Sequence, residues 1–547
     1  MGPQIFVFVF VIINLHFTII SNHYVAPHHF FKFYRIFRFL SFRFVSFSYN
    51  IFITIILRFI FVPLFFFRFR YSTMETEHDF VVLHFDGKII KYLRGDTEDR
   101  LAIAISVPEF INGQFLASPA IPSGKGLAMS NCLTDVVNEY GFMRKIEALV
   151  FDTTASNTGV WSGATTRFEE TLCKAIFWLA CRHHIPELFV KHANIVVRGK
   201  DTKAPEDQLF IKFEKAFTFI DKDLKQTWVW PSRNDWRYQR ASDVLEWAEH
   251  HMRFNTWPRE DYRELLELTV IFLGGIVKRM QFGSFNVIAS PIRKPGARHR
   301  ARFMASCLYL YKIFMFQAQF DVLTPETTSQ VAIMTEYIAL IHVPYFLKCP
   351  IAITAPRQDR DFWIDLLTYK KCFTPGSVQW EMINAVQCNF KNHMWYLSEE
   401  CVIFGLFDIN VSTQERKAMA EKLILQPRPT DFPGGKPIFE PELLTDQPQL
   451  ISFMGPYSWL LFHKLSANGE WLQRDPDEWD KDEEFKRMQT FLQDLKVVND
   501  LAERCVKDVQ DYKDMTKDSK HRDEIIIVAT DYRGVIKDTR KKSIAMR

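Results

Sequence analysis

Short apolar runs separated by turn residues begin at residue 80 and predict β-strands. The runs DFVVLHFDGKII, RLAIAISVP and INGQFLASPAI follow one another, with an Asn-Gly pair inside the third. Their length and residue types are typical of strands, and the turn residues between them favour antiparallel pairing. This part of the chain therefore predicts a meander of three strands.

The next segments alternate between helical and strand patterns. PSGKGLAMSNCLTDVVNEYGF has apolar residues at helical spacing and stops at Gly141, and IEALVFD then predicts a strand that ends on Asp152. TRFEETLCKAIF predicts a helix, IFWLAC a strand and HIPELFVKHA a further helix. Three antiparallel strands followed by helix, strand, helix and strand are the element order of an RNase H-like sheet.

That arrangement makes the first and fourth strands neighbours, so Asp86 and Asp152 would lie side by side at one edge of the sheet. Two adjacent carboxylates repel each other unless a cation lies between them. Mg²⁺ or Mn²⁺ would take such oxygen ligands and leave positions for phosphate oxygens. The structural alternative stays open, because Asp before Thr and Ser often caps a loop and Asp-Gly is an ordinary turn pair.

Residues 199–490 have mainly helical patterns, rich in Trp and Tyr, with a Pro/Gly-rich connector at 426–445. They predict a helical insertion between residues 74–198 and a C-terminal helix of the core at 491–515. Residues 516–547 read as a charged tail with a basic end. The predicted fold class is therefore α/β, an RNase H-like mixed sheet interrupted by a large all-helical insertion.

A cluster of cations within the insertion is a candidate nucleic-acid-binding surface. Side chains of this kind can neutralise phosphates without reading base sequence. Charge runs are also common on solvated faces, so that alternative stays open. The cluster consists of Arg293, Lys294, Arg298, Arg300 and Arg302.

Residues 1–73 differ in composition from the rest of the chain. They hold 19 of the 52 Phe residues and seven Lys or Arg, but no Asp or Glu. Without them the chain is slightly acidic, so it offers no general basic field for DNA. The segments 5–20 and 51–67 approach membrane-spanning length.

Three interpretations of residues 1–73 are open. They are a signal or anchor sequence, although MGPQ lacks the basic start of such a signal, or a pair of genuine membrane spans. We favour the third, in which the segment is translated non-coding sequence and Met74 is the natural start. The protein would then be nuclear or cytoplasmic, and it would be membrane-attached only if residues 1–73 are retained.

The nine Cys residues favour a reducing compartment. They lie between Cys132 and Cys505, are odd in number and form no Cys-x-x-Cys pair. This pattern is typical of buried thiols in a cytosolic or nuclear protein rather than of a disulfide framework. The cysteine pattern therefore counts against secretion.

An ordered set of motifs resembles the hAT superfamily of DDE transposases, and more closely a set of uncharacterised, transposon-derived proteins. The motifs are LHFDGK, FDTTASNTG, LACRHHIPEL, GARHRARFMASCLYLYKI, HMWYLSEECVIFGLF and VVNDLAERCVKDVQDY, which together cover most of residues 80–515. Members of the superfamily carry a Cys-x-x-His motif after the second catalytic Asp. Here Cys181 and His184 match it, and they would flank the site.

The resemblance implies two-metal cleavage or joining of DNA strands, with Mg²⁺ or Mn²⁺ held by Asp86 and Asp152. It also implies a third catalytic acid on a helix beyond the insertion. Glu503, followed by Arg504, is our preferred match, and Glu399 or Glu400 is the alternative. An i,i+4 surface pair of Glu503 with Lys507 is the structural interpretation.

One departure from the superfamily concerns target recognition. Transposases usually carry a DNA-binding module ahead of the catalytic fold, whereas Asp86 follows Met74 closely and no Cys precedes it. The competing hypothesis is therefore a catalytically inactive, domesticated transposase that serves as a nucleic-acid-binding or protein-interaction module. DNA is the expected partner of the first hypothesis, and a homo-oligomer is compatible with both.

Overall fold

The structure is a computed structural model, and the chain divides into two compact units, Met1–Thr76 and Glu77–Arg547. All described residues belong to the second unit: 80–91, 97–107, 113–199, 207–253, 257, 259–281, 284–287, 292–296, 302–512, 518, 521–523 and 525–526. The membrane, signal and non-native interpretations of residues 1–73 lie outside the described residues. So do Arg298, Arg300 and most of the charged tail.

A mixed sheet forms the core of the N-terminal part. Its order is β3-β2-β1-β5-β6, and the two-residue β4 pairs with β2. The first three strands are antiparallel, as predicted, whereas β1, β5 and β6 are parallel. The strands are β1 Val81–Lys91, β2 Thr97–Ser106, β3 Gln114–Ala117, β4 Ala120–Ile121, β5 Ile146–Phe151 and β6 Phe177–Ala180.

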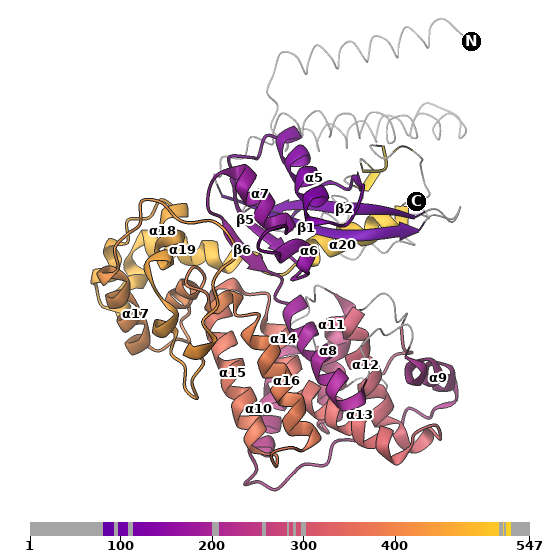
Figure 1. Ribbon diagram of the computed structural model, residues 1–547. Coiled ribbons are helices and arrows are strands. Elements are labelled where there is room, and N and C mark those ends of the chain that lie inside the picture. Colours follow the sequence, from indigo (N-terminus) through magenta and orange to yellow (C-terminus); the bar gives the residue numbers. More distant parts are fainter. Residues whose placement is uncertain are drawn as a thin grey trace, which may run out of the picture. The chain divides into compact units, whose positions relative to one another are not determined.

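The central strands are short apolar runs because both faces of the sheet are covered. Residues of β5 and β6 are almost all buried. Helix α20, Asp500–Tyr512, packs on β1 and β2 through Leu501, Cys505 and Val509. Figure 1 shows this C-terminal helix, in yellow, beside strands from the start of the described chain. The other helices of this part are α5 Gly126–Glu139, α6 Ala155–Thr158, α7 Ala164–Leu172 and α8 His184–Arg198.

The segment between α8 and α20 is mainly helical, which confirms the helical pattern read from the sequence. The short hairpin of β7 Lys278–Gln281 and β8 Ser284–Val287 was not expected. A π-helical segment, Ile338–His342, joins two helices of this region. The helices are α9 Gln208–Ala216, α10 Trp236–His251, α11 Glu260–Phe272, α12 Arg302–Met315, α13 Pro325–Tyr337, α14 Val343–Lys348, α15 Ala355–Lys371, α16 Val378–Lys391, α17 Thr413–Leu425, α18 Leu460–Lys464 and α19 Glu483–Asp494.

The predicted helix over TRFEETLCKAIF ends earlier than expected. Cys173 adopts a left-handed conformation with φ of 52°, and its N–H closes the last turn of α7 on Glu169. Such a residue cannot continue a right-handed helix. The chain can therefore turn into β6, whose buried strand takes over the apolar end of the predicted helix.

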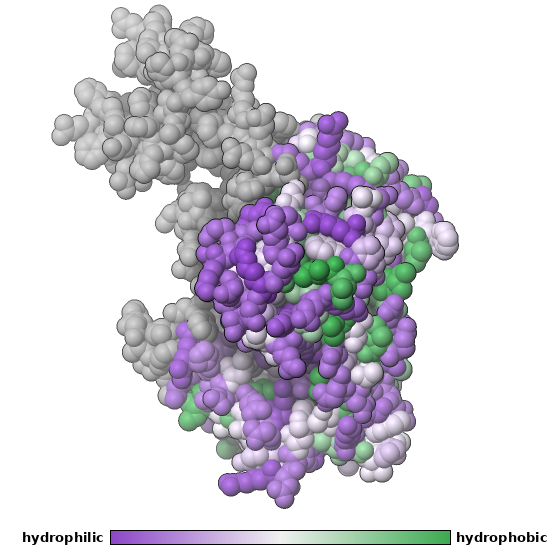
Figure 2. Space-filling model, turned by 90° about the vertical axis from the view of Figure 1, so that its left-hand side faces the viewer, coloured by the Kyte–Doolittle hydropathy of each residue, from purple (hydrophilic) through white to green (hydrophobic). Residues whose placement is uncertain are grey.

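Three further observations concern the cysteines, the apolar helices and the surface. All nine cysteines are free, and five of them are buried. Among the described residues one helix, Pro325–Lys348, is long and apolar enough to cross a membrane, but 72% of its apolar window is buried, as in a core helix. Figure 2 shows a mostly hydrophilic face with a small hydrophobic patch.

Candidate functional site

The structure brings Asp86 and Asp152 together on neighbouring strands. His84 of β1 pairs with Val150 of β5 in parallel register, so two residues further along each strand the two aspartates stand level. Asp86 is 7% exposed and Asp152 is 5% exposed. β5 ends at Phe151, while β1 continues beyond Asp86 to Lys91. The carboxylate pair therefore lies at the carboxyl end of β5, beside the middle of β1.

The polar residues after β5 hold the backbone of Asp152. Thr154 N–H and the Asn157 side-chain amide each donate to the Asp152 carbonyl at 2.8 Å. These bonds use the backbone carbonyl of Asp152, whereas the capping role that the structural interpretation expects uses the side chain. The Asp152 side chain is turned to another element, because its Oδ2 lies 3.5 Å from Nδ1 of His184, in the first turn of α8. The backbone of Asp152 is therefore held by α6, while its carboxylate faces His184.

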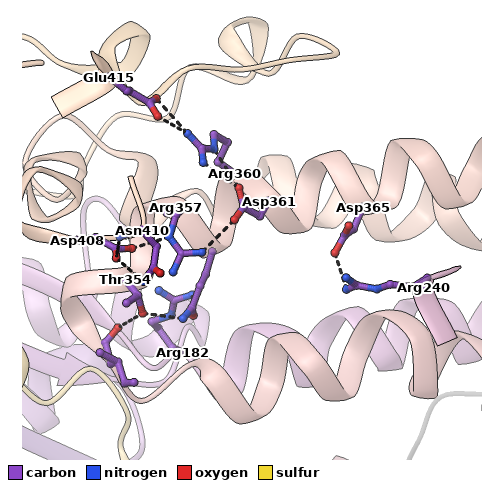
Figure 3. Close-up of polar contacts among 12 residues, drawn as sticks. Arg182, Arg240, Thr354, Arg357, Arg360, Asp361, Asp365, Asp408, Asn410 and Glu415 are labelled. Atoms are coloured by element: carbon purple, nitrogen blue, oxygen red, sulfur yellow. Dashed lines mark hydrogen bonds and ion pairs between the residues drawn. The ribbon is translucent and has the colours of Figure 1, made fainter. Parts of the chain in front are cut away.

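Cys181, Arg182 and His183 contact three other parts of the chain. The backbone N–H of Asn499 donates to Cys181 Sγ at 3.1 Å. Arg182 Nη2 donates to Asp359 of α15 at 2.6 Å, and Figure 3 shows Arg182 within this polar network. His183 Nδ1 lies 3.3 Å from Asp500 of α20. Together with His184, this short segment joins the sheet to the helical region and to α20.

Helix α20 brings Glu503 to the same end of the sheet. Just before it, the Asn499 side chain donates to the carbonyl of Phe85 at 2.9 Å, next to Asp86. Burial raises the pKa of the Cys181 thiol well above its usual range, and the charges of Asp152 and Glu503 raise it further. Both carboxylates therefore act electrostatically on one buried thiol.

Glu503 is engaged by the helical region. Arg259 Nη1 lies 3.2 Å from Glu503 Oε2, and the guanidinium also pairs with Asp261. The pair of Glu503 with Lys507 stays a prediction. Arg259, which directly precedes α11, therefore neutralises Glu503, the acid that we expected to complete the site.

Sequence reasoning missed Asp500 and Tyr262. Tyr262 O–H donates to Asp500 Oδ1 at 2.9 Å, and the same oxygen faces His183. Burial alone would raise the pKa of Asp500, but His183, Arg259 and Tyr262 outweigh burial and lower it to about 2. The signal available in the sequence was the i,i+3 spacing of Asp500 and Glu503 in NDLAER, which places both on one face of a helix.

The alternative acids Glu399 and Glu400 lie in a different setting. The Glu399 carboxylate accepts from the backbone N–H of Tyr457. Burial raises the pKa of both carboxyls. None of the contacts found for them in the described part of the chain involves Asp86 or Asp152.

The basic cluster is only partly described. Arg293 lies 3.2 Å from Glu260 and 4.0 Å from Glu267, both of α11, so acidic neighbours offset its charge. Lys294 is exposed, and Arg302 begins α12. The phosphate-binding role of this cluster stays a prediction.

Asp86 and Asp152 suit Mg²⁺ or Mn²⁺ as a two-carboxylate site. Within the described ranges, no group of three or more His, Cys, Asp or Glu residues is arranged to hold a metal ion. Mg²⁺ is nevertheless often bound by one or two carboxylates together with substrate phosphates. The two buried carboxylates offer the oxygen donors that Mg²⁺ and Mn²⁺ prefer.

The comparisons with family models and with curated proteins found no match. The fold and the site define a mixed α/β protein with two buried aspartates, one within β1 and one directly after the parallel strand β5. Along the chain, a mainly helical segment lies between these strands and α20, the helix that packs against the sheet.

Proposed function

We propose that this chain is a transposon-derived protein of the hAT-like DDE type, with an RNase H-like fold and DNA as its partner. The observation that carries the proposal is the level placement of Asp86 and Asp152 on adjacent parallel strands. The order β3-β2-β1-β5-β6 and the return of α20 after a long helical segment support it. The reaction would be metal-dependent cleavage or transfer of a DNA strand.

Each site residue has a distinct task in this proposal. Asp86 and Asp152 would hold Mg²⁺ or Mn²⁺, which supplies a Lewis acid for phosphate oxygens and for the attacking hydroxyl or water. His184 orients the Asp152 carboxylate from the first turn of α8. Glu503 is the third acid. Its carboxylate pairs with Arg259 in the structure, and the site would be complete when this carboxylate turns from Arg259 to the metal ion.

A second function is favoured by two observations. Arg259 is paired with Glu503, and the described residues contain no three-ligand metal group. These observations are what a catalytically inactive, domesticated protein would show, in which α20 serves packing alone. Such a protein would act as a nucleic-acid-binding or protein-interaction module, as a homo-oligomer or with another partner.

Mn²⁺ titration and strand cleavage separate the two functions. We expect the full chain to bind Mn²⁺ in calorimetry and to cut a labelled oligonucleotide, and Asp86→Asn with Asp152→Asn to lose both activities. Glu503→Gln should keep Mn²⁺ binding and lose cleavage by about 10²-fold or more. Asp446→Asn, at an exposed ion pair with Lys371, is the matched control.

The contrary result is equally clear. A wild-type chain that binds no Mn²⁺ and cuts no strand would reject the catalytic proposal and leave the inactive module. Mn²⁺ binding that survives the double substitution would show that the ion binds elsewhere, and would reject the assignment of Asp86 and Asp152.

A further inference from the structure

Asn499, the residue before α20, is a buried amide with one unused oxygen. The residue is 0% exposed. Its Nδ2 donates to the Phe85 carbonyl at 2.9 Å, and this bond identifies the nitrogen arm of the amide, because a carbonyl can only accept. The other arm, Oδ1, has no hydrogen-bond partner among the described residues. A buried acceptor without a partner is costly, so this oxygen requires an explanation.

Hydrogen bonds connect Asn499 to the two residues that precede the aspartates. Phe85, whose carbonyl accepts from the amide, directly precedes the aspartate of β1. The backbone N–H of Asn499 donates to Cys181 Sγ at 3.1 Å. Cys181 N–H in turn donates at 2.8 Å to the carbonyl of Phe151, which directly precedes the aspartate after β5. Asn499 therefore lies at the part of the sheet where the two carboxylates stand level.

Strand alternation puts Asp86 on the face of the sheet that α20 covers. Asp86 pairs with Ala102 of β2 in antiparallel register, and residues directly opposite each other share a face. Ala102 packs in one buried cluster with Leu501 and Cys505 of α20. Asp86 therefore faces the helix that Asn499 precedes.

The backbone of Asn499 also contacts the residue that we expect to be the third acid. Glu503 N–H donates to the Asn499 carbonyl at 3.0 Å, in the first turn of α20. Burial raises the pKa of the Cys181 thiol, and the charges of Asp152 and Glu503 raise it further. Asn499, which donates to that thiol, is therefore close to the segments that carry all three candidate acids.

An amide oxygen is a ligand of the kind that this site needs. Among the described residues, no group of three His, Cys, Asp or Glu side chains is arranged to hold a metal ion, so a third protein ligand in this arrangement would be of another kind. Carbonyl oxygens are donors that Mg²⁺ and Mn²⁺ accept. A neutral oxygen also avoids adding a third negative charge beside two carboxylates that already repel each other.

We propose that Asn499 Oδ1 is a third protein ligand of the cation held by Asp86 and Asp152. The inference rests on the proposed function, which supplies the metal ion, and deepens it by adding a neutral ligand. The hydrogen bond from Nδ2 to the β1 carbonyl orients the amide before the ion arrives. Asn499 would then bind the ion while Glu503 is still paired with Arg259.

Calorimetric titration of the full chain with Mn²⁺ tests the assignment without DNA. Asn499→Ala should weaken Mn²⁺ binding by about 10-fold or more. Asn499→Asp restores an oxygen at the same position and should bind Mn²⁺ at least as tightly as the wild type. Asn194→Ala is the matched control, because Asn194 is a 1% exposed amide in the second half of α8. Its Mn²⁺ affinity should equal that of the wild type.

Luminescence of bound Eu³⁺ separates a ligand from a residue that only shapes the site. Eu³⁺ prefers oxygen ligands, and its lifetimes in H₂O and D₂O report how many water molecules it binds. A water molecule should replace the lost oxygen in Asn499→Ala, whereas Asn499→Asp should keep the hydration of the wild type. Asn499→Ser, whose hydroxyl lies one atom nearer the backbone, is a second variant and should also gain a water. Melting in a chelator shows that each variant is folded.

The outcomes distinguish this inference from the proposed function. Unchanged Mn²⁺ affinity in folded Asn499→Ala or Asn499→Ser, in a chain that binds Mn²⁺ through Asp86 and Asp152, would overturn the ligand alone. Weaker Mn²⁺ binding with unchanged Eu³⁺ hydration would also overturn it, in favour of a structural role. A wild type that binds no Mn²⁺ would overturn both proposals. Mn²⁺ binding and hydration that depend on Asn499, in a chain that never cuts DNA, would support the ligand while the catalytic proposal fails.

Discussion

Individual residues in this protein are specified by the partners they meet from distant segments. Cys181 meets Asn499, Arg182 meets Asp359 and His183 meets Asp500. Each contact is buried or partly buried, where a polar group without a partner is costly. Substitutions within Cys181–His184 are therefore expected to affect both the site and stability.

Buried histidines should make the fold sensitive to acid. Burial, together with the charge of Lys496, lowers the pKa of His84 to about 3. The unfolded chain takes up the proton first as pH falls from about 6.5, so stability is lost towards pH 3. We expect His84→Gln to reduce this loss by roughly 2 kcal/mol at about pH 5, measured as melting temperature against pH.

The exposed His463 provides the control for this prediction. His463→Gln should keep the acid sensitivity of the wild type. His342, whose burial also lowers its pKa to about 3, should leave part of the sensitivity in His84→Gln. An unchanged pH profile in His84→Gln would contradict the assignment.

At the scale of elements, the helix Pro325–Lys348 shows how a proline is accommodated inside a buried helix. Pro344 has no N–H to donate to the carbonyl of Leu340, as a regular helix would require. The chain forms a π-helical segment over Ile338–His342, and Arg240 Nε of α10 donates to the Leu340 carbonyl at 2.8 Å. A side chain from a neighbouring helix therefore replaces the missing backbone donor.

Arg240→Met removes the side-chain donor to the Leu340 carbonyl and should therefore destabilise the fold. Leu340 is buried, so its carbonyl would lose a partner at a cost of roughly 1–3 kcal/mol in the free energy of unfolding. Asp365→Asn removes only the charge that pairs with Arg240 and should cost less than about 1 kcal/mol. Denaturant unfolding of both variants measures the difference, and equal effects would assign the role to the ion pair instead.

At the scale of the folded Glu77–Arg547 unit, the sheet and the helical region are joined by a buried ion pair. Arg182 follows β6, and its guanidinium contacts the rings of Tyr345 and Tyr396 while it pairs with Asp359 of α15. Figure 3 shows further pairs along α15, among them Arg357 with Asp408 and Arg360 with Glu415. The ion pairs along α15 therefore include one, Arg182 with Asp359, that comes from the end of the sheet where the candidate site lies.

Asp359→Asn should weaken the contact between the sheet and the helical region, because it leaves the charge of Arg182 buried without its counter-charge. We expect a loss of about 3–5 kcal/mol in the free energy of unfolding. Backbone amides of β6 and α15 should lose protection together in hydrogen exchange. Asp446→Asn, at an exposed pair, should change neither quantity, and a loss of protection confined to α15 would contradict the proposed joint.

Local patterns in the sequence were sufficient for most elements. Alternating and helical apolar spacing predicted the antiparallel meander, β5, β6 and α8, because such periodicity reflects which face of each element is buried. The early end of α7 and the hairpin of β7 and β8 were missed. The first depends on one residue with positive φ and the second on strands of only four residues, and neither leaves a periodic signal.

The sequence by itself determined the elements and suggested the level placement of Asp86 and Asp152, because neighbouring residues set periodicity and element order restricts strand pairing. Tertiary structure alone decided that α20 packs on β1 and β2 and that Arg259 pairs with Glu503. It also decided that the buried Asn499 bonds to Phe85 and Cys181. These facts depend on contacts between segments far apart in the chain, which local patterns do not encode.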